Sequence, residues 1–179
     1  MTSRARAGQP NDSSDDAFPA DFLDFIRALN AHRVEYMLVG GYAVGIHGYV
    51  RATTDIDFFY ANTSDNVERL MRAMMTFGAP VELIDARHLA AADAVTQMGA
   101  PPIRIDLLSS LSGVTFDEAV SGVIRVEIAG AMLPVIGLEA LRQNKQATKR
   151  PKDRDDLRQL PAAPGSPPSS SQKPGRRRR

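Results

Sequence analysis

The chain has 179 residues, of which 43% are hydrophobic, and its formal net charge is +1. This length favours one domain with tails, and the apolar fraction is large enough for a buried core. The absence of cysteine excludes structural disulfides and cysteine-ligated zinc.

Both ends of the chain differ in composition from its middle. Residues 1–16 are polar and small, which predicts a flexible leader, and no apolar segment typical of a signal peptide occurs there. Residues 161–179 are rich in proline and serine, carry five positive charges and no acid, and predict a disordered basic tail. We therefore expect one folded domain over residues 17–160. No apolar run reaches the roughly 18 residues of a membrane helix, so we expect no membrane contact. The default expectation for a chain without cysteine is a cytoplasmic protein.

The first half of the domain alternates between helical and strand patterns. A helix is predicted from Pro19 onward, because apolar residues recur there at helical spacing. An apolar run at 34–39 predicts a central strand, and residues 41–47 predict a short helix. Residues 55–60 predict a second strand. Side chains two apart on a strand share a face, so Asp55 and Asp57 should point the same way.

The second half continues the alternation. Ser64 is predicted to cap a helix that Gly78 and Pro80 end. Residues 81–100 predict a short helix near 85–91 and then a loop. Further predictions are a strand at 103–108, a helical turn at 116–120, a hairpin of 123–128 and 131–135, a helix at 137–147, and a last helix capped by Asp153. The fold class is therefore α/β, a mixed β-sheet flanked by helices with short helices at the C-terminal end.

One stretch carries a specific chemical pattern. Gly40 and Gly41 follow the apolar strand, and backbone N–H groups at such a helix start suit an anion. Asp55 and Asp57 should lie with their Cα atoms roughly 6.5 Å apart, a spacing that suits two divalent cations about 4 Å from each other. A metal clamp beside a phosphate cradle indicates a nucleoside triphosphate.

With these motifs the chain resembles the DNA polymerase β-type nucleotidyltransferase superfamily, in particular its small prokaryotic branch of abortive-infection and toxin–antitoxin nucleotidyltransferases. The resemblance rests on Leu38-Val-Gly-Gly41, on Arg51-Ala-Thr-Thr-Asp55-Ile-Asp57, on Ile105-Asp106, and more loosely on Asn144-Lys145 with Arg150-Pro-Lys-Asp153. It covers roughly residues 34–160. Many members have serine after the glycines, where this chain has Tyr42, so one phosphate contact is expected to be missing.

The resemblance implies a nucleotidyltransferase fold and a set of site residues. Asp55, Asp57 and Asp106 would be catalytic and would ligate two Mg²⁺ ions. Gly40, Gly41, Arg51 and Lys145 would bind the nucleotide, ATP or another nucleoside triphosphate.

Less specific interpretations of the same residues stay open. Asp55 can be a cap and Asp57 a solvated strand residue, and Asp85 or Asp93 can replace Asp106 as third carboxylate. The glycine pair can serve strand–helix packing alone. Arg51 can be a solvated loop cation, and Lys145 can belong to a solvated basic helix face with Arg142 and Lys149.

Two functional hypotheses follow. The leading one is a magnesium-dependent enzyme that moves a nucleoside monophosphate from a triphosphate to an RNA end, a protein hydroxyl or a small molecule, within a toxin–antitoxin or phage-defence pair. The alternative is a catalytically inactive relative that acts as a protein-binding module. RNA binding through the arginine tail has little support in the mildly acidic folded region.

Overall fold

The computed structural model describes residues 18–162, so the predicted leader and nearly all of the predicted tail lie outside the described residues. Its elements are α1 (Ala20–Ala31), β1 (Tyr36–Val39), α2 (Gly40–Ile46), β2 (Asp55–Tyr60), α3 (Ser64–Phe77), a 3₁₀ turn (Val81–Leu83), α4 (Ala86–Leu89), β3 (Val95–Ala100), β4 (Ile103–Leu108), α5 (Phe116–Val120), β5 (Ile124–Ile128), β6 (Ala131–Val135), α6 (Leu138–Thr148) and α7 (Pro151–Gln159). Within this range no helix is long and apolar enough to span a membrane.

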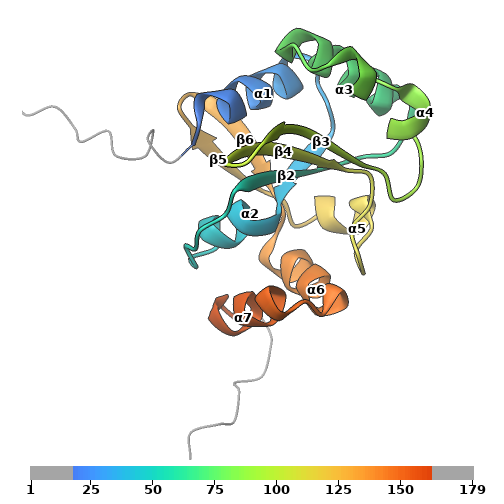
Figure 1. Cartoon of the computed structure of the whole chain (residues 1–179). Helices are drawn as coiled ribbons and strands as arrows, with labels where there is room; N and C mark the ends of the chain where they lie inside the picture. Colours follow the sequence, from blue (N-terminus) through green and yellow to red (C-terminus); the bar gives the residue numbers. More distant parts are fainter. Residues whose placement is uncertain (1–17, 163–179) are drawn as a thin grey trace, which may run out of the picture.

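The strands form one mixed sheet in the order β3-β4-β2-β1-β6-β5 (Figure 1). β2 runs parallel to β4 and β1 runs parallel to β6, whereas the β1–β2, β3–β4 and β5–β6 pairs are antiparallel. The predicted mixed α/β class is therefore confirmed. The two central strands, β1 and β2, are also the two that the sequence placed on either side of the glycine turn.

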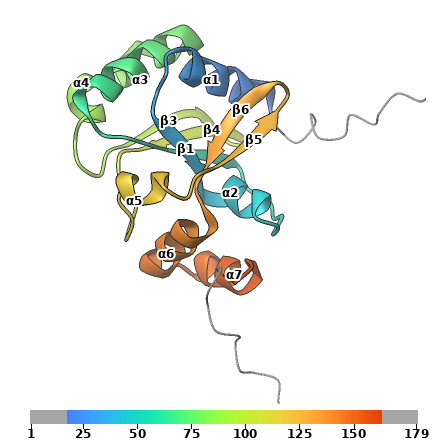
Figure 2. The same ribbon diagram turned by 180° about the vertical axis from the view of Figure 1, so that it is seen from behind.

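Helices cover both faces of the sheet (Figures 1 and 2). α1 and α3 pack on one face, where the Phe25 ring lies 5.8 Å from that of Phe58 on β2. α2, α5, α6 and α7 lie on the opposite side, where Phe59 packs against Phe116 at 5.2 Å. Alternate residues of β2 thus bury side chains on opposite faces, and this alternation sends Asp55 and Asp57 toward α2 and α6.

The loop predicted after residue 91 is wrong, because residues 95–100 form β3, an edge strand paired antiparallel to β4. The strand is half-buried: Thr96 and Met98 are buried, whereas the alternating residues Val95 and Gln97 are exposed. Only two positions face the core, and that is too short an apolar alternation to reveal a strand in the sequence.

Two predicted helix caps are also wrong. The Thr63 hydroxyl, one residue before Ser64, accepts from the Asn66 N–H at 3.3 Å and caps α3. α7 begins at Pro151 with Arg150 as its cap residue, and Asp153 is a buried residue of its first turn. Proline at the first helical position fixes this start, since its missing N–H needs no partner there.

Candidate active site

The parallel pairing of β2 with β4 gathers three carboxylates. Asp57 lies opposite Asp106 in the register, and Asp55 lies opposite Arg104. Each of Asp55, Asp57 and Asp106 offers one oxygen within 4.8 Å of the others. This cluster, called the carboxylate triad below, consists of the three predicted metal ligands.

The two spare candidates for the third carboxylate have other partners. Asp85 caps α4 and accepts from the Arg87 N–H at 2.8 Å. Asp93 accepts a hydrogen bond from the Ser110 hydroxyl. Neither belongs to the triad, so Asp106 is the third carboxylate of this arrangement.

Neighbouring polar side chains hold the triad in place. Arg104 donates through Nε and Nη2 to both oxygens of Asp106, at 2.8 and 2.9 Å, and through Nη2 to Asp55 at 2.8 Å. Gln97 on β3 donates to Asp106 at 3.2 Å, and the Thr53 hydroxyl donates to Asp55 at 3.1 Å. These bonds orient Asp55 and Asp106, whereas no group among residues 18–162 donates a hydrogen bond to the side chain of Asp57.

Asp57 has the most perturbed environment of the three. Burial, together with the negative charges of Asp55 and Asp106, raises its pKa to about 6, against the opposing effect of Lys152 and Lys145. A carboxyl group that resists ionisation without a counter-charge is expected where a cation is to bind.

The glycine turn is shaped by the triad. Gly40 has a φ of +66°, and a Cβ built on it would collide with the Asp57 carboxylate. A Cβ on Gly41 would lie 2.7 Å from the Thr53 hydroxyl oxygen. Both glycines line the same cavity as the triad, so the packing role is present at both positions and does not exclude the predicted nucleotide contact.

Tyr42, which directly follows the glycine pair, packs away from the triad. Its ring lies 5.0 Å from that of Phe18 and 5.8 Å from that of Phe22 on α1. It anchors α2 to the core. Burial, helped by the negative charge of Asp55, raises the pKa of its hydroxyl.

Helices α6 and α7 form the opposite wall. Lys145 is buried, and its Nζ lies 2.8 Å from both Asp153 and Asp156 of α7. The interpretation of Lys145 as part of a solvated basic face is therefore wrong. Arg150 pairs with Asp153 at 2.9 Å, so the two buried aspartates hold these cations at the edge of the cavity.

Arg51 joins this wall from the loop between α2 and β2. Its Nε and Nη2 donate to the two oxygens of Asp156, at 2.7 and 3.0 Å. Burial alone would raise the pKa of Asp156, but the hydrogen bonds from Arg51 and Lys145 outweigh it and hold that pKa below its ordinary value. Arg51 is therefore an ion-paired residue rather than a solvated loop cation, and like Lys145 it lines the cavity.

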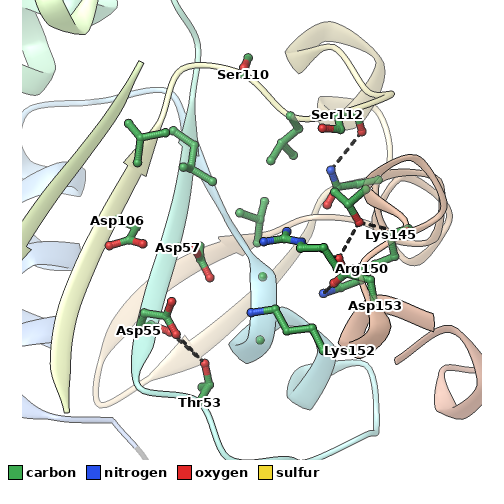
Figure 3. Close-up of a pocket in the computed structure, with 18 of the residues that line it drawn as sticks. Thr53, Asp55, Asp57, Asp106, Ser110, Ser112, Lys145, Arg150, Lys152 and Asp153 are labelled. Atoms are coloured by element: carbon green, nitrogen blue, oxygen red, sulfur yellow. Dashed lines mark hydrogen bonds and ion pairs between the residues drawn. The ribbon is translucent and has the colours of Figure 1, made fainter. Parts of the chain in front are cut away.

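A cavity of about 430 Å³ separates the two walls. Figure 3 shows Asp55, Asp57 and Asp106 on one side and Lys145, Arg150 and Lys152 on the other. The Lys152 side chain extends across the cavity toward the carboxylates. An acidic wall facing a basic wall is suited to a ligand that carries both metal ions and phosphate groups.

The family described as "Nucleotidyl transferase of unknown function (DUF2204)" matches residues 20–166. The chain belongs to this family. It is accordingly a nucleotidyltransferase, and the alternative of an inactive binding module loses its support. No protein of established, curated function matches the sequence at a significant level.

Solved structures share the fold at low sequence identity. The lincosamide antibiotic adenylyltransferase LnuA, bound to lincomycin, is 14% identical, with a TM-score of 0.54 over 80% of this chain and 96% of its own. TM1012 of Thermotoga maritima, assigned as a nucleotidyltransferase, is 15% identical, with a TM-score of 0.53 over 76% and 88%. ANT(2'')-Ia, in complex with adenylyl-2''-tobramycin, is also 15% identical, with a TM-score of 0.50 over 76% and 83%. The predicted nucleotidyltransferase fold is confirmed.

Three residues of the site are not predicted from the sequence as functional residues. Arg104 lies two residues before Asp106 on the same strand, and this spacing is the signal that could identify it. Gln97 lies on β3, a segment whose sequence predicts a loop. Asp156 carries no local signal, because its partners Arg51 and Lys145 lie far away in the sequence.

Gly40→Ala should displace the Asp57 carboxylate. We expect a loss of about 1–3 kcal/mol in the free energy of unfolding, from the positive φ and the collision, together with weaker metal binding. Gly45→Ala is the matched control, since its Cβ would meet nothing within 4 Å and should change stability by less than about 1 kcal/mol. Denaturant unfolding measures the free energy of unfolding of both variants. An equal loss in the two variants would refute the packing of Gly40 against Asp57.

Asp57→Asn should stabilise the protein at pH 7 in EDTA, by about 1–2 kcal/mol after allowance for solvent screening. The pKa of Asp57 is raised to about 6 from 3.8, so between these values the folded state binds more protons than the unfolded state. Wild-type stability therefore falls as pH rises through that window, and the advantage of the variant should grow from pH 4 to pH 6 and then level off. A variant no more stable than wild type at pH 7 would contradict this electrostatic description.

Proposed function

We propose that this protein transfers a nucleoside monophosphate from a magnesium-bound nucleoside triphosphate to an acceptor hydroxyl. The observation that carries the proposal is the carboxylate triad, with one oxygen from each member within 4.8 Å of the others, facing a wall of lysine and arginine. The new bond joins the acceptor oxygen to the α-phosphorus, the bond to the β-phosphate oxygen breaks, and pyrophosphate leaves.

The donor set fits Mg²⁺. It consists of carboxylate oxygens only, and magnesium takes one or two carboxylates together with waters and substrate phosphates. Two bound ions would stabilise negative charge on the attacking and leaving oxygens of the displacement. Asp55 and Asp57, which share one face of β2, are suited to hold the ion of the triphosphate. Asp106 is suited to hold the ion of the acceptor and to take the hydroxyl proton.

The basic wall supplies the contacts for the triphosphate. Lys152 already extends into the cavity toward the triad, and Arg150 stands beside it at the start of α7. Lys145 and Arg51 are held by buried carboxylates, so their positive charge is fixed in position before the ligand arrives. Gly40 and Gly41, which line the cavity, would let the chain approach phosphate closely.

The charges around the triad favour a neutral or anionic acceptor over a polycation. Apart from the triad, the only carboxylate that lines the cavity within residues 18–162 is Asp153, and it is paired with Lys145. On the β3–β4 side, where Asp106 would meet the acceptor, the polar side chains are Gln97, Arg104 and Ser110. A polycationic aminoglycoside would find no free carboxylate there.

The acceptor decides the biological role. An RNA end or a protein hydroxyl would suit a toxin–antitoxin or phage-defence pair, and a neutral antibiotic would suit resistance.

The test is incubation with each triphosphate labelled at the α-phosphate, with Mg²⁺ and cell extract. Label should appear on RNA, protein or a small molecule, and Asp55→Asn should abolish it. If no fraction carries label with any triphosphate, the proposed transfer is wrong.

Asp106→Ala should lower kcat by about a hundredfold or more and change triphosphate affinity little, because Asp106 would act mainly on the acceptor side. Asp65→Ala, which removes an exposed carboxylate in the first turn of α3, is the control and should retain activity. Steady-state kinetics and calorimetric titration with the triphosphate separate the two effects. An equal loss of affinity and kcat in Asp106→Ala would contradict its assignment to the acceptor side.

A further inference from the structure

Among residues 18–162, Arg104 donates more hydrogen bonds to the triad than any other side chain. Its guanidinium forms a two-bond pair with Asp106, using both carboxylate oxygens, and a third bond to Asp55. The hydrogen bond to Asp106 and the charge of that residue raise the pKa of Arg104, so it remains a cation at any working pH. A positive charge therefore sits among the same oxygens that the proposed function assigns to metal.

The three carboxylates are not equally engaged by Arg104. Both oxygens of Asp106 accept from Arg104, and Gln97 adds a further bond to one of them. Asp55 gives one oxygen to Arg104 and the other to Thr53. Asp57 accepts from neither Arg104 nor any other group within residues 18–162. The Asp57 carboxylate thus has no hydrogen-bond donor within the described residues to displace when a cation binds, whereas the Asp106 carboxylate is already paired with Arg104.

Arg104 lies next to the edge strand β3 and is partly exposed to solvent. Its antiparallel neighbour on β3 is Gly99, whose φ is +78° and whose Cβ would lie 2.5 Å from the Ile103 carbonyl oxygen. The backbone there requires glycine, and the Ile103 carbonyl fills the space that a side chain would take, so position 99 contributes no side chain beside Arg104. The Arg104 side chain is about one quarter exposed, so it can turn toward solvent and release Asp106.

We propose that Arg104 is a tethered competitor for the divalent cation at Asp106. The inference rests on the proposed function, because it takes the triad as a metal site. One ion binds first at Asp57 and Asp55, and the second binds only when the guanidinium releases Asp106. Arg104 therefore sets the affinity of the second site and makes the triad bind metal in two steps of unequal strength.

The test is a titration with Mn²⁺ alone, followed by electron paramagnetic resonance of the free ion. Wild type should show one stronger and one weaker site. In Arg104→Gln the weaker site should tighten by about tenfold, because the competing charge and its bonds are gone. Arg104→Lys keeps the charge but cannot span two carboxylates, so its affinity at the weaker site should lie between those of wild type and Arg104→Gln. Arg72→Gln, which removes an exposed arginine paired with Glu68 on α3, is the control and should match wild type.

Thermal unfolding gives a second readout. Without metal, Arg104→Gln should unfold at a lower temperature than wild type, since Asp55 and Asp106 lose the cation that pairs with them. Added Mn²⁺ should raise its unfolding temperature by more than it raises that of wild type, as expected for a ligand that binds the folded state more tightly. If Arg104→Gln does not fold, the affinity of Arg104→Lys decides.

The outcomes separate this inference from the proposed function. If wild type binds Mn²⁺ and a folded Arg104 variant binds it with unchanged or weaker affinity, the competition is refuted and the metal site stands. If neither wild type nor the variants bind Mn²⁺ at millimolar concentration, the metal site itself fails, and the proposed function and this inference fall together.

Discussion

The site depends on the parallel register between β2 and β4. That pairing sets Asp57 beside Asp106 and Asp55 beside Arg104, on the face of the sheet away from α1 and α3. Three carboxylates in such proximity repel one another, and the raised pKa of Asp57 reflects burial first and this repulsion second. A shift of one residue in the register would turn the carboxylates of one strand to the opposite face and disperse the cluster.

The second half of the site is held by a charge network that links α6, α7 and the loop before β2. Asp153 and Asp156 of α7 fix Lys145 of α6, and Asp156 also fixes Arg51 from the loop before β2. Buried ion pairs add little net stability, but the loss of one partner leaves an unpaired charge, so such networks specify position more than they stabilise. Here they set a basic wall across the cavity from an acidic one, and the binding chemistry follows from that opposition.

The sequence was sufficient to predict the acidic wall and insufficient for the basic one. Asp55, Asp57 and Asp106 lie on apolar strands whose alternation is visible in the sequence, and the glycine pair marks the turn between β1 and α2. Lys145 was identified as a cation but its burial was not, because its partners come from another helix. β3, and with it Gln97, was missed since an exposed edge strand has only a weak apolar pattern. Positions set by local periodicity can be predicted from the sequence, whereas contacts set by tertiary packing cannot.

The most direct test of the account is a crystal structure of the protein with Mn²⁺ and a triphosphate whose α–β bridge cannot be cleaved. The account predicts anomalous density for two ions about 4 Å apart, bound by Asp55, Asp57 and Asp106, with the phosphate chain against Lys152 and Arg150. A triphosphate bound without metal at the triad, or bound outside the cavity between the two walls, would contradict it.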